Sequence, residues 1–549
     1  MRGDVTRRRA LASGALLTGA MASGACSPFG REHFAGTLDG ADFTRGHALR
    51  DRLFPPATGP ERHARVVIAG GGAAGLAAGW RLRDAGFDDF VVLELENQAG
   101  GNARGGRNAI SAYPLGAHYL PIPNREAGAL RRMLGQFGMI VGTDAAQDGA
   151  PVYDPFQVCA DLEERLFWRG SWQEGLFPQT GLSAAERAQH EAFEREMARY
   201  NSAVGHDGKP AFAVPLVASS GDSEFTGLDL ISFATWLDRR GWTSAPLRAY
   251  IRYCCRDDYG TEPEEVSAWA GVHYFAARRG WTSAEDRDRE LTWPEGNARL
   301  IALMAARIGA ERIVSAHSVF GAQTENNENG GGALIDVYDH TAKSSHRYRA
   351  GTAILAMPQF VAARICDQVG GARGFSYAPW VVANVSVSRP PRGPGVPLAW
   401  DNVSAASDSL GYVVATHQSH SDDDGPTVLT WYMPLSKLDP ALARHVMLDR
   451  SLADWQAMVA DDLLGLHPDL AGAITRIDVW RWGHAMIRPT VGFLTDPDRL
   501  TVQGLAPPLL RAHSDMSGMS IFEEAHYRGT AAAEAAMRHL GHPFESVLA

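Results

Sequence analysis

The chain has 549 residues, which is too long for one simple hydrophobic core and predicts two or more domains. Hydrophobic residues make up 45% of the sequence and charged residues 21%, as in an ordinary soluble globular protein. The formal net charge is -11, from 52 basic and 63 acidic residues, and a surface of this sign argues against nucleic acid or anionic lipid as a partner.

The first 25 residues have the pattern of an export signal. Thr6 is followed by Arg7, Arg8 and Arg9, and then by a short apolar run rich in Ala and Gly. The paired arginines resemble a twin-arginine signal, although Ala10 stands where that signal usually has Phe. The apolar run is too short for a permanent membrane anchor. We therefore expect the twin-arginine export machinery to carry the protein to the periplasm or the cell envelope.

The end of this signal is compatible with two processing enzymes. Ser23-Gly24-Ala25 before Cys26 suits an ordinary signal peptidase, and it also resembles a lipoprotein box in which Cys26 carries a lipid tether. Ser23 departs from that box, which usually has Leu at this place. Both enzymes would cut before Cys26, which leaves residues 26–63 as a lead-in and predicts no transmembrane span in the mature chain.

The other cysteines give no sign of a metal site. Cys159, Cys254, Cys255 and Cys366 have neither CxxC spacing nor a Cys/His spacing typical of metal ligands, so no metal is predicted. We expect these four residues to be buried thiols, with a long-range disulfide still open in an oxidising compartment.

Residues 66–101 carry a dinucleotide-binding fingerprint. A buried parallel strand is predicted over 65–69, a helix over 76–85 and a second strand over 90–93. In the loop between the first strand and the helix, Gly70 permits a tight turn, Gly72 lets a diphosphate approach the backbone, and Gly75 lets the helix pack on the sheet. Glu94 ends the second strand, where an acidic side chain can accept hydrogen bonds from an adenosine ribose. The predicted cofactor contacts here are Gly70, Gly72, Ala74, Gly75 and Glu94.

Two nearby segments resemble the flavin-containing amine oxidase superfamily, which also includes phytoene desaturases and protoporphyrinogen oxidases. Gly100-Gly101-Asn102 resembles its second glycine signature, which usually continues with Arg; here Arg104 comes two residues later. Residues 114–119 resemble its segment beside the isoalloxazine ring. The resemblance implies FAD, with the phosphate charge neutralised by Arg104 or by backbone amides, and noncovalent binding is expected because no Cys or His lies in an evident attachment motif. The further contacts that it implies are Gly101, Asn102, Arg104, Gly116, Ala117 and His118.

The resemblance extends to later segments. A helix is predicted over 293–308, followed by strands over 313–320, 333–338 and 347–356, in the order by which the superfamily returns to its FAD-binding domain. A backbone group near Val319 would then meet the adenine.

The C-terminal segment resembles the last motif of the superfamily. Asp515 fits the place of an acidic residue that meets the ribityl chain of the flavin. A helix predicted over 527–540 is rich in small residues, so it could pack closely against the first glycine loop.

We therefore expect an α/β fold in which a Rossmann-like FAD-binding domain is interleaved with an α+β substrate domain. The FAD-binding domain would comprise residues 64–120, 290–360 and 505–549, and the substrate domain residues 121–289 and 361–504. Helices dominate the first part of the substrate domain, including one opened by a capping box at Ser183 and Glu186. The second part is richer in strands, at 380–387, 412–416 and 428–432.

Catalytic residues are harder to name, because a flavin performs the redox chemistry and the protein mainly shapes the cavity around it. The catalytic candidates are His118 and Tyr119 beside the flavin, and Trp482 and His484 further along the chain. Trp400-Asp401-Asn402 is a further candidate for the cavity wall, and plain core packing is the competing interpretation for each Trp. Asp257-Asp258 is interpreted as a helix-end turn, with a cation site as the alternative.

One departure from the superfamily bears on the reaction. Many of its amine oxidases have a Lys bridged by water to the flavin, early in the strand comparable to 380–387. This chain has Ala383 or Asn384 at that place, and its three lysines, Lys209, Lys343 and Lys437, lie elsewhere. The resemblance therefore supports FAD binding more strongly than amine oxidation.

The leading hypothesis is an exported FAD-dependent oxidoreductase that oxidises a small organic substrate. An amine C–N bond is favoured, with oxygen or a quinone-like compound as the acceptor. The sequence has no second glycine fingerprint for a separate NAD(P)H domain. Two alternatives stay open: a desaturase or isomerase of an apolar, polyene-like substrate, and a non-catalytic flavin-binding protein of the envelope.

Overall fold

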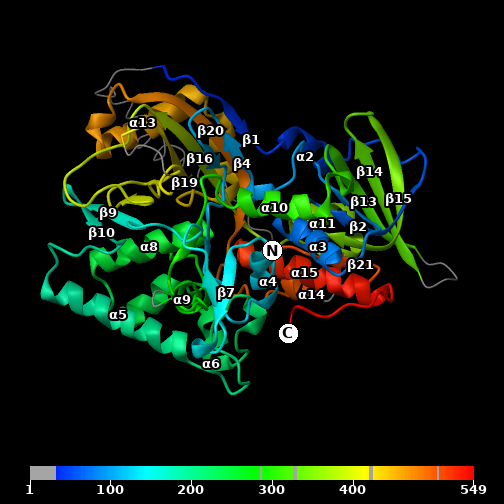
Figure 1. Cartoon of the computed structure of the whole chain (residues 1–549), viewed down its shortest axis with the longest axis horizontal. Helices are drawn as coiled ribbons and strands as arrows, with labels where there is room; N and C mark the ends of the chain where they lie inside the picture. Colours follow the sequence, from blue (N-terminus) through cyan, green and yellow to red (C-terminus); the bar gives the residue numbers. More distant parts are fainter. Residues whose placement is uncertain (1–32, 285–286, 326–330, 420–423, 504–505, 549) are drawn as a thin grey trace, which may run out of the picture.

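The computed structural model describes residues 33–284, 287–325, 331–419, 424–503 and 506–548. The predicted export signal and Cys26 lie outside the described residues. Two sheets stand on opposite sides of the molecule, and a group of helices lies below the larger one (Figure 1). In the described part of the chain, no helix is both long and apolar enough to cross a membrane.

The first sheet is built on the predicted dinucleotide fingerprint. Its strands follow the order β12-β3-β2-β15-β14-β13, and β21 also pairs with β15. The strands β3, β2, β15 and β21 run parallel, whereas β13, β14 and β15 form an antiparallel meander. The bounds are β2 (Arg62–Ala69), β3 (Phe90–Leu93), β12 (Ile313–Val314), β13 (His317–Glu325), β14 (Gly332–Asp339), β15 (Ser344–Leu355) and β21 (Leu509–Arg511).

The predicted strands of this sheet are confirmed with one correction. The strand expected over 313–320 is divided into β12 and β13, because Ala316 adopts a left-handed φ of 57° between them. Its backbone amide donates to the Glu96 carbonyl oxygen, 2.8 Å away, so the break is tied to the loop after β3. Alanine rarely adopts a left-handed backbone conformation, so the sequence does not predict this break.

Three helices cover one face of this sheet: α3 (Ala73–Asp84), α10 (Ala298–Ile308) and α15 (Phe522–His539). Glycines permit the close packing, since a Cβ on Gly529 would lie only 2.1 Å from the Ala74 carbonyl oxygen. The helix α15 begins at Phe522, earlier than the predicted start at 527, because Glu523 and Glu524 in its first turn are buried rather than exposed. Two adjacent acidic residues have the pattern of a solvated turn, so the sequence pattern predicts the start of this helix too late.

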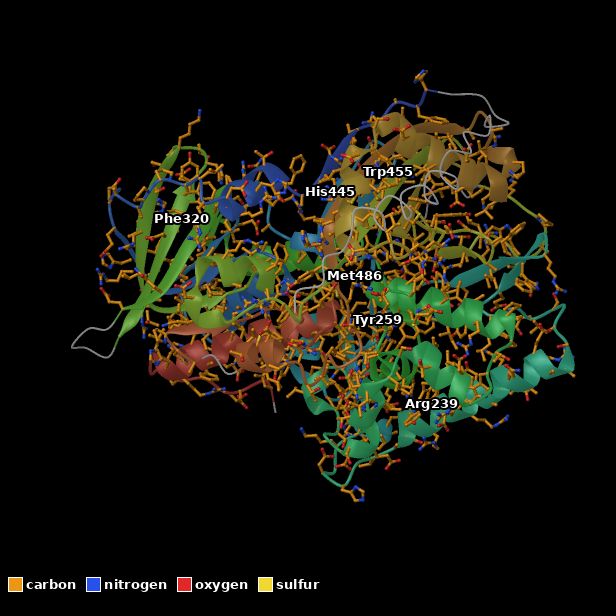
Figure 2. The ribbon with its side chains drawn as sticks, turned by 180° about the vertical axis from the view of Figure 1, so that it is seen from behind. Arg239, Tyr259, Phe320, His445, Trp455 and Met486 are labelled. Atoms are coloured by element: carbon orange, nitrogen blue, oxygen red, sulfur yellow. The ribbon has the colours of Figure 1, made fainter. Side chains whose placement is uncertain are left out.

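The second sheet has eight strands in the order β1-β20-β16-β19-β18-β17-β9-β10. Their bounds are β1 (Leu38–Gly40), β9 (Glu164–Trp168), β10 (Ser171–Glu174), β16 (Tyr377–Val387), β17 (Asp401–Ser404), β18 (Tyr412–Val414), β19 (Thr427–Pro434) and β20 (Ile474–Ile487). The helices α12 (Pro440–Asp449) and α13 (Leu452–Leu466) cover one face, where Trp455 is fully buried. Seen from behind, Trp455 and Phe320 mark the two halves of the molecule (Figure 2).

The helical part comprises α5 (Ala184–Ser202), α6 (Ser223–Thr226), α7 (Phe233–Arg239), α8 (Ala245–Tyr259) and α9 (Ala268–Ala276). The predicted capping box is confirmed, since Ser183 and Glu186 exchange both of its hydrogen bonds at the start of α5. The four described cysteines are buried free thiols, as expected, and Cys254 and Cys255 lie within α8.

The remaining elements connect these three parts. They are α2 (Phe43–Arg50), β4 (Gly105–Arg107), β5 (Ala112–Pro114), β6 (Tyr119–Pro121), α4 (Gly128–Gln136), β7 (Ile140–Asp144), β8 (Ala150–Tyr153), β11 (Glu290–Thr292), α11 (Gln359–Ile365) and α14 (Pro497–Gln503). The short antiparallel pair of β6 and β11 links the segment predicted beside the flavin to the start of the 290–360 region.

Candidate active site

The first glycine turn leaves room for a ligand. Gly70 has a φ of 110°, and a Cβ on Gly75 would lie 1.8 Å from the Gly70 carbonyl oxygen, so α3 packs directly on the turn. A Cβ on Gly72 would meet only the Gly101 Cα, 3.9 Å away, so the space beside Gly72 is open. Gly72 is also the N-cap of α3 and offers no capping side chain, which leaves the first amides of the helix for an anion. Ala74 is buried in the first turn of that helix.

Glu94 is fixed at the carboxyl end of β3. Its two carboxylate oxygens accept the backbone amides of Gly71 and Glu96, each at 2.8 Å. Burial raises the pKa of Glu94, and these two amide hydrogen bonds oppose that effect. Val319, the residue predicted near the adenine, is buried in the same hydrophobic cluster as Leu93. The predicted adenosine contacts therefore come together at one edge of the parallel sheet.

The second glycine turn folds onto the first. The Gly100 amide donates to the Gly71 carbonyl oxygen at 2.8 Å, and Gly100 and Gly101 have φ values of 133° and 55°. The side-chain amide of Asn102 donates to the Ala485 carbonyl oxygen on β20. This turn thus ties the glycine cradle to the second sheet.

Arg104 is engaged by protein groups. Its guanidinium carbon lies 5.2 and 5.3 Å from the ring centres of Trp480 and Trp482, and its Nε donates to the Gly101 carbonyl oxygen at 3.2 Å. It also lies 3.5 Å from a carboxylate oxygen of Glu96. Of the two predicted routes to phosphate neutralisation, backbone amides are therefore the better placed.

The segment 114–119 is held between the two sheets. The Ala117 amide donates to the Asn102 carbonyl oxygen at 3.1 Å, and a Cβ on Gly116 would lie 2.3 Å from that same oxygen. From the second sheet, the indole nitrogen of Trp482 donates to the Leu115 carbonyl oxygen at 2.6 Å, and Asn384 donates to the Pro114 carbonyl oxygen at 3.2 Å. Trp482, a predicted catalytic candidate, positions this segment through its backbone.

His118 and Tyr119 face an aromatic group. The His118 ring centre lies 4.9 Å from that of Tyr432 and 5.7 Å from that of Trp400, and its Nδ1 lies 3.2 Å from the Gly116 carbonyl oxygen. Burial lowers the pKa of His118 to about 4, so its imidazole is neutral at physiological pH. Tyr119 donates its hydroxyl to Asp257 at 3.3 Å.

His484 lies apart from His118, beside Asp515. Its ring stacks on Phe360 at 4.3 Å and lies 5.8 Å from the ring of Tyr377, and burial lowers the pKa of His484 to about 4. Asp515 is fully buried, and its Oδ2 accepts the Tyr377 hydroxyl at 2.5 Å and the Gln359 amide at 2.7 Å. Its Oδ1 lies 3.1 Å from the Nδ1 of His513, and this imidazole helps to lower the pKa of Asp515 despite its burial. The four catalytic candidates thus fall into separate groups rather than one.

Next to His118 and Tyr119 lies a cluster of four carboxyl groups, which we call the acidic cluster: Glu164, Asp257, Glu290 and Asp401. Asp401 accepts the Tyr253 hydroxyl at 3.0 Å and the Tyr432 hydroxyl at 3.3 Å. It is also the register partner of Glu164 across the parallel strands β17 and β9. None of the four carboxyls has a basic partner within ion-pairing distance in the described ranges of the chain.

The electrostatics of the acidic cluster favour a cation. Burial, and then the neighbouring negative charges, raise the pKa of Glu164 to about 7 and that of Asp257 to about 7. The same two causes raise the pKa of Glu290 and Asp401 well above the usual carboxyl range. Arg278 offsets part of this effect, but its guanidinium already pairs with Asp258 at 2.9 Å. A bound cation would relieve the repulsion that these groups impose on one another.

Sequence reasoning found only part of this cluster. Asp401 was a candidate for the cavity wall, whereas Asp257-Asp258 was taken for a helix-end turn. Both residues do lie in the last turn of α8, as that interpretation expects, but Asp257 also accepts the Tyr119 hydroxyl and so belongs to the cluster. Glu164 and Glu290 belong to no motif, and only the pairing of distant strands brings them here.

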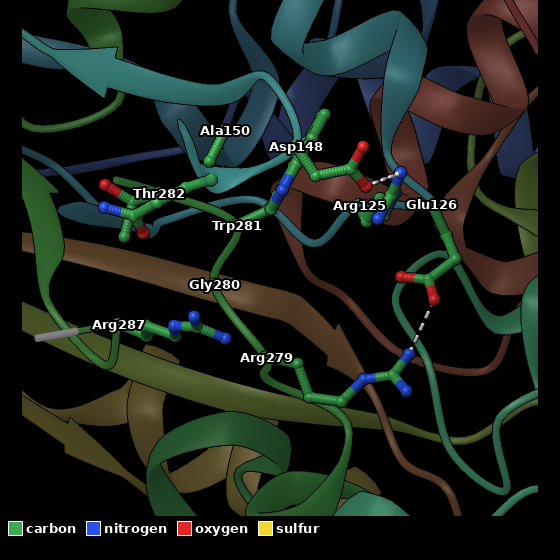
Figure 3. Close-up of a pocket in the computed structure, with 10 residues that line it drawn as sticks. Arg125, Glu126, Asp148, Ala150, Arg279, Gly280, Trp281, Thr282 and Arg287 are labelled. Atoms are coloured by element: carbon green, nitrogen blue, oxygen red, sulfur yellow. Dashed lines mark hydrogen bonds and ion pairs between the residues drawn. The ribbon is translucent and has the colours of Figure 1, made fainter. Parts of the chain in front are cut away.

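The cavity drawn in Figure 3 is separate from this site. It has a volume of about 460 Å³, and its lining includes Arg125 and Arg279. Arg125 pairs with Asp148 at 2.6 Å, and Arg279 pairs with Glu126 at 2.9 Å. None of the residues predicted for the cofactor or for catalysis lines it. This cavity is therefore not the predicted cofactor or catalytic site.

The fold is that of an α/β protein with a dinucleotide-binding domain, and comparisons with known proteins agree with it. A family model described as an NAD(P)-binding Rossmann-like domain matches residues 68–137, and no match is found among curated proteins. The expected α/β fold with a Rossmann-like dinucleotide-binding domain is thereby confirmed.

Solved structures similar to the whole chain include two amine oxidases. Wild-type putrescine oxidase bound to putrescine is 18% identical, with a TM-score of 0.59 over 86% of this chain and 99% of that chain. Cyclohexylamine oxidase from Brevibacterium oxydans IH-35A is 15% identical, with a TM-score of 0.60 over 87% of this chain and 99% of that chain. A CLA-producing fatty acid isomerase from P. acnes is 15% identical, with a TM-score of 0.56 over 85% of this chain and 97% of that chain. At such identities the likeness establishes the fold.

Proposed function

We propose that this chain is an FAD-dependent oxidoreductase that oxidises the C–N bond of a small amine, with oxygen or a quinone-like compound as the acceptor. The observation that carries the proposal is the acidic cluster, which lies beside His118 and Tyr119. An ammonium group is the small organic cation that such a cluster would bind, and aromatic walls add cation–π attraction. The similarity in fold to putrescine oxidase and cyclohexylamine oxidase supports this choice.

The residues of the cradle fit FAD. The open space at Gly72 would take the diphosphate, and the Glu94 carboxylate would take the ribose hydroxyls. The Asp515 carboxylate, whose Oδ1 lies beside the His513 imidazole, would accept a hydroxyl of the ribityl chain. FAD, when bound, supplies the acceptor for the hydride of the C–H bond next to nitrogen. No Cys or His lies in an attachment motif, so noncovalent binding is proposed.

The protein groups would bind and orient the substrate. Asp401, with its two tyrosine donors, would hold the ammonium group, while Tyr432 and Trp400 would exclude water around the reacting carbon. The raised pKa of Glu164 and Asp257, about 7, also makes these carboxyls acceptors for the ammonium proton at neutral pH. An amine must lose this proton before its C–N bond can be oxidised. His118 stays neutral and so does not repel the cation.

A desaturase or isomerase of an apolar substrate is the second candidate. The observation in its favour is the strand β16, where Asn384 bonds to the Pro114 carbonyl oxygen and no Lys is present. The similarity in fold to a fatty acid isomerase agrees with it. One buried and three half-buried carboxyl groups would, however, face an apolar chain at high energetic cost, which favours the amine.

A substrate screen separates these functions. Purified FAD-loaded protein is offered primary amines, diamines, fatty acids and polyenes, with peroxide production and dye reduction as readouts. Turnover of amines alone supports the proposal, and turnover of a polyene or fatty acid alone replaces it with the second candidate. If no compound reduces the bound flavin, the non-catalytic envelope protein becomes the better account.

We also propose that the protein is exported folded, with FAD already bound, by the twin-arginine machinery. The support is the arginine run after Thr6 and the small residues before Cys26. Cys26 would serve as a lipid tether if a lipoprotein peptidase makes the cut.

A further inference from the structure

The segment before the dinucleotide-binding sheet spans both halves of the molecule. The sheet begins at Arg62, so residues 33–61 precede it. At one end, β1 pairs in parallel with β20 of the second sheet, with Leu38 opposite Val479 and Gly40 opposite Arg481. The backbone around Ala35 also accepts hydrogen bonds from Gln456 of α13. The start of the segment is therefore anchored on the second sheet.

The segment then crosses to the loop that follows β3. The Asp42 amide donates to the Glu96 carboxylate at 2.8 Å. Arg45 donates one guanidinium nitrogen to the Leu95 carbonyl oxygen at 2.6 Å and the other to the Asn97 side chain at 2.9 Å. Asp42 also caps α2 by accepting the Arg45 amide at 3.0 Å, so the helix start and the loop are held together.

The far end of the segment is anchored on the first sheet. Leu49, the buried residue of α2, belongs to the hydrophobic cluster of Leu93, Val319 and Leu355. The ring of Phe54 stacks on that of Tyr338 at 4.8 Å. Figure 1 shows α2 between β1 and the strands β13 and β14. We call residues 35–54 the strap.

The strap contacts the end of the first sheet at which a dinucleotide is expected to bind. In an open parallel sheet a dinucleotide binds outside the carboxyl ends of the strands. The strap contacts the loop directly after the carboxyl end of β3, and this loop carries Glu94, whose Oε1 accepts the Glu96 amide. Its buried Leu49 packs with Val319, the residue expected beside the adenine. Contacts in the middle of the strap hold the ribose-binding loop, and contacts near its far end hold the adenine-side strand.

We propose that the strap retains FAD by closing the adenosine end of the cradle, with Arg45 as its positioning residue. This inference rests on the proposed function, because it assumes that FAD is the dinucleotide. Arg45 touches no cofactor atom in this account and acts by fixing the loop 94–97. Loss of its two hydrogen bonds would let that loop and the strap separate, and FAD would leave faster.

The test measures FAD release rather than turnover. The full-length holoprotein is diluted until FAD no longer rebinds, and the appearance of free flavin fluorescence is followed for the wild type and the Arg45→Ala variant. Two net hydrogen bonds correspond to roughly tenfold or more in the release rate. The matched control is Arg50→Ala, since Arg50 lies on the same helix and, within the described residues, pairs with the exposed Asp51 at 2.7 Å and with no other carboxylate. Arg50→Ala should release FAD at the wild-type rate.

Further variants separate positioning from general stability. Arg45→Lys keeps the charge but cannot donate to both Leu95 and Asn97, so its release rate should fall between those of the wild type and Arg45→Ala. Asn97→Ala combined with Arg45→Ala should add less than the two single effects, because they remove a shared contact. Equal rates of FAD release from Arg45→Ala and Arg50→Ala would overturn the proposal that the strap retains FAD. This holds even if Arg45→Ala lowers the unfolding temperature of the FAD-free protein.

The outcome distinguishes the strap from the proposed function. Wild-type protein that holds FAD and oxidises amines, together with unchanged release from Arg45→Ala, removes the strap alone. Wild-type protein that binds no FAD removes both.

Discussion

Replacing Asp401 by Asn tests the assignment of the ammonium site. Asp401 is 5% exposed, and its carboxylate oxygens accept the hydroxyls of Tyr253 at 3.0 Å and Tyr432 at 3.3 Å. Asn keeps the size of the side chain and one oxygen acceptor but removes the charge. Truncating one partner of a buried charge pair costs about 2–5 kcal/mol of binding free energy. We expect a cost at the lower end of this range for Asp401, because its pKa is raised and the carboxyl must first ionise to bind the cation.

This cost converts into a measurable change in affinity. A loss of about 2–3 kcal/mol weakens amine binding roughly 30- to 150-fold. The assay is anaerobic titration of the oxidised protein with an amine and, in parallel, with the neutral alcohol of the same shape, whose affinity should change little. The matched control is Asp408→Asn, since Asp408 is exposed and pairs with Lys437 on the surface. If Asp401→Asn binds the amine as tightly as the wild type, or weakens for amine and alcohol alike, the charge-pair argument is wrong.

Three further predictions follow from the same geometry. Amine binding should tighten as the pH rises through about 7, because the raised pKa values of Glu164 and Asp257 lie there. In titrations between about pH 6 and 8, the Glu164→Gln/Asp257→Asn variant should show a flatter dependence of affinity on pH. The sign for stability is opposite, because both groups have a higher pKa in the folded than in the unfolded chain. The ligand-free protein should therefore lose stability from about pH 4 upward, with the loss complete above about pH 7 and worth roughly 3 kcal/mol for Glu164 and roughly 4 kcal/mol for Asp257. Thermal melts of the same variant should lack this trend. Gly72→Ala should leave the unfolding temperature of the FAD-free protein unchanged, since the new Cβ meets only the Gly101 Cα at 3.9 Å. It should weaken FAD binding at least about tenfold, because the methyl group occupies the diphosphate space. Equal FAD affinity would remove Gly72 from the cradle. Replacing Arg7 and Arg8 by Lys should leave the folded, FAD-loaded protein in the cytoplasm, as detected by cell fractionation, and unchanged export would exclude the twin-arginine route.

The dinucleotide cradle could be predicted because its signals are local in the sequence. Gly70, Gly75 and Glu94 lie within one strand–helix–strand unit, and each has a geometric reason to be there. The turn at Gly100 was found for the same reason. Asp515 lies far along the chain, and it was placed only by resemblance to a known motif.

The acidic cluster could not be predicted, because its members come from four separate elements. Glu164 lies on β9, Asp257 on α8, Glu290 on β11 and Asp401 on β17. Only the parallel pairing of β17 with β9 and the packing of α8 beside Tyr119 bring these side chains together. A carboxyl pair at the end of a helix is common as a solvated turn, so Asp257-Asp258 gave a misleading local signal.

The strap was missed for a related reason. Residues 26–63 have no motif and were taken for a simple lead-in after the signal. The contacts of Asp42 and Arg45 with the loop 94–97 depend on the tertiary fold, which positions a short helix of low amphipathicity against a distant strand end.

The most direct test of the central claim is anaerobic mixing of the purified FAD-loaded protein with a primary amine. The account predicts that the flavin absorbance band near about 450 nm bleaches with the amine and stays unchanged with the alcohol of the same shape, since only the amine presents a cation to the acidic cluster. A protein that carries no flavin, or a flavin that the amine fails to bleach while a neutral or apolar substrate succeeds, would contradict the account.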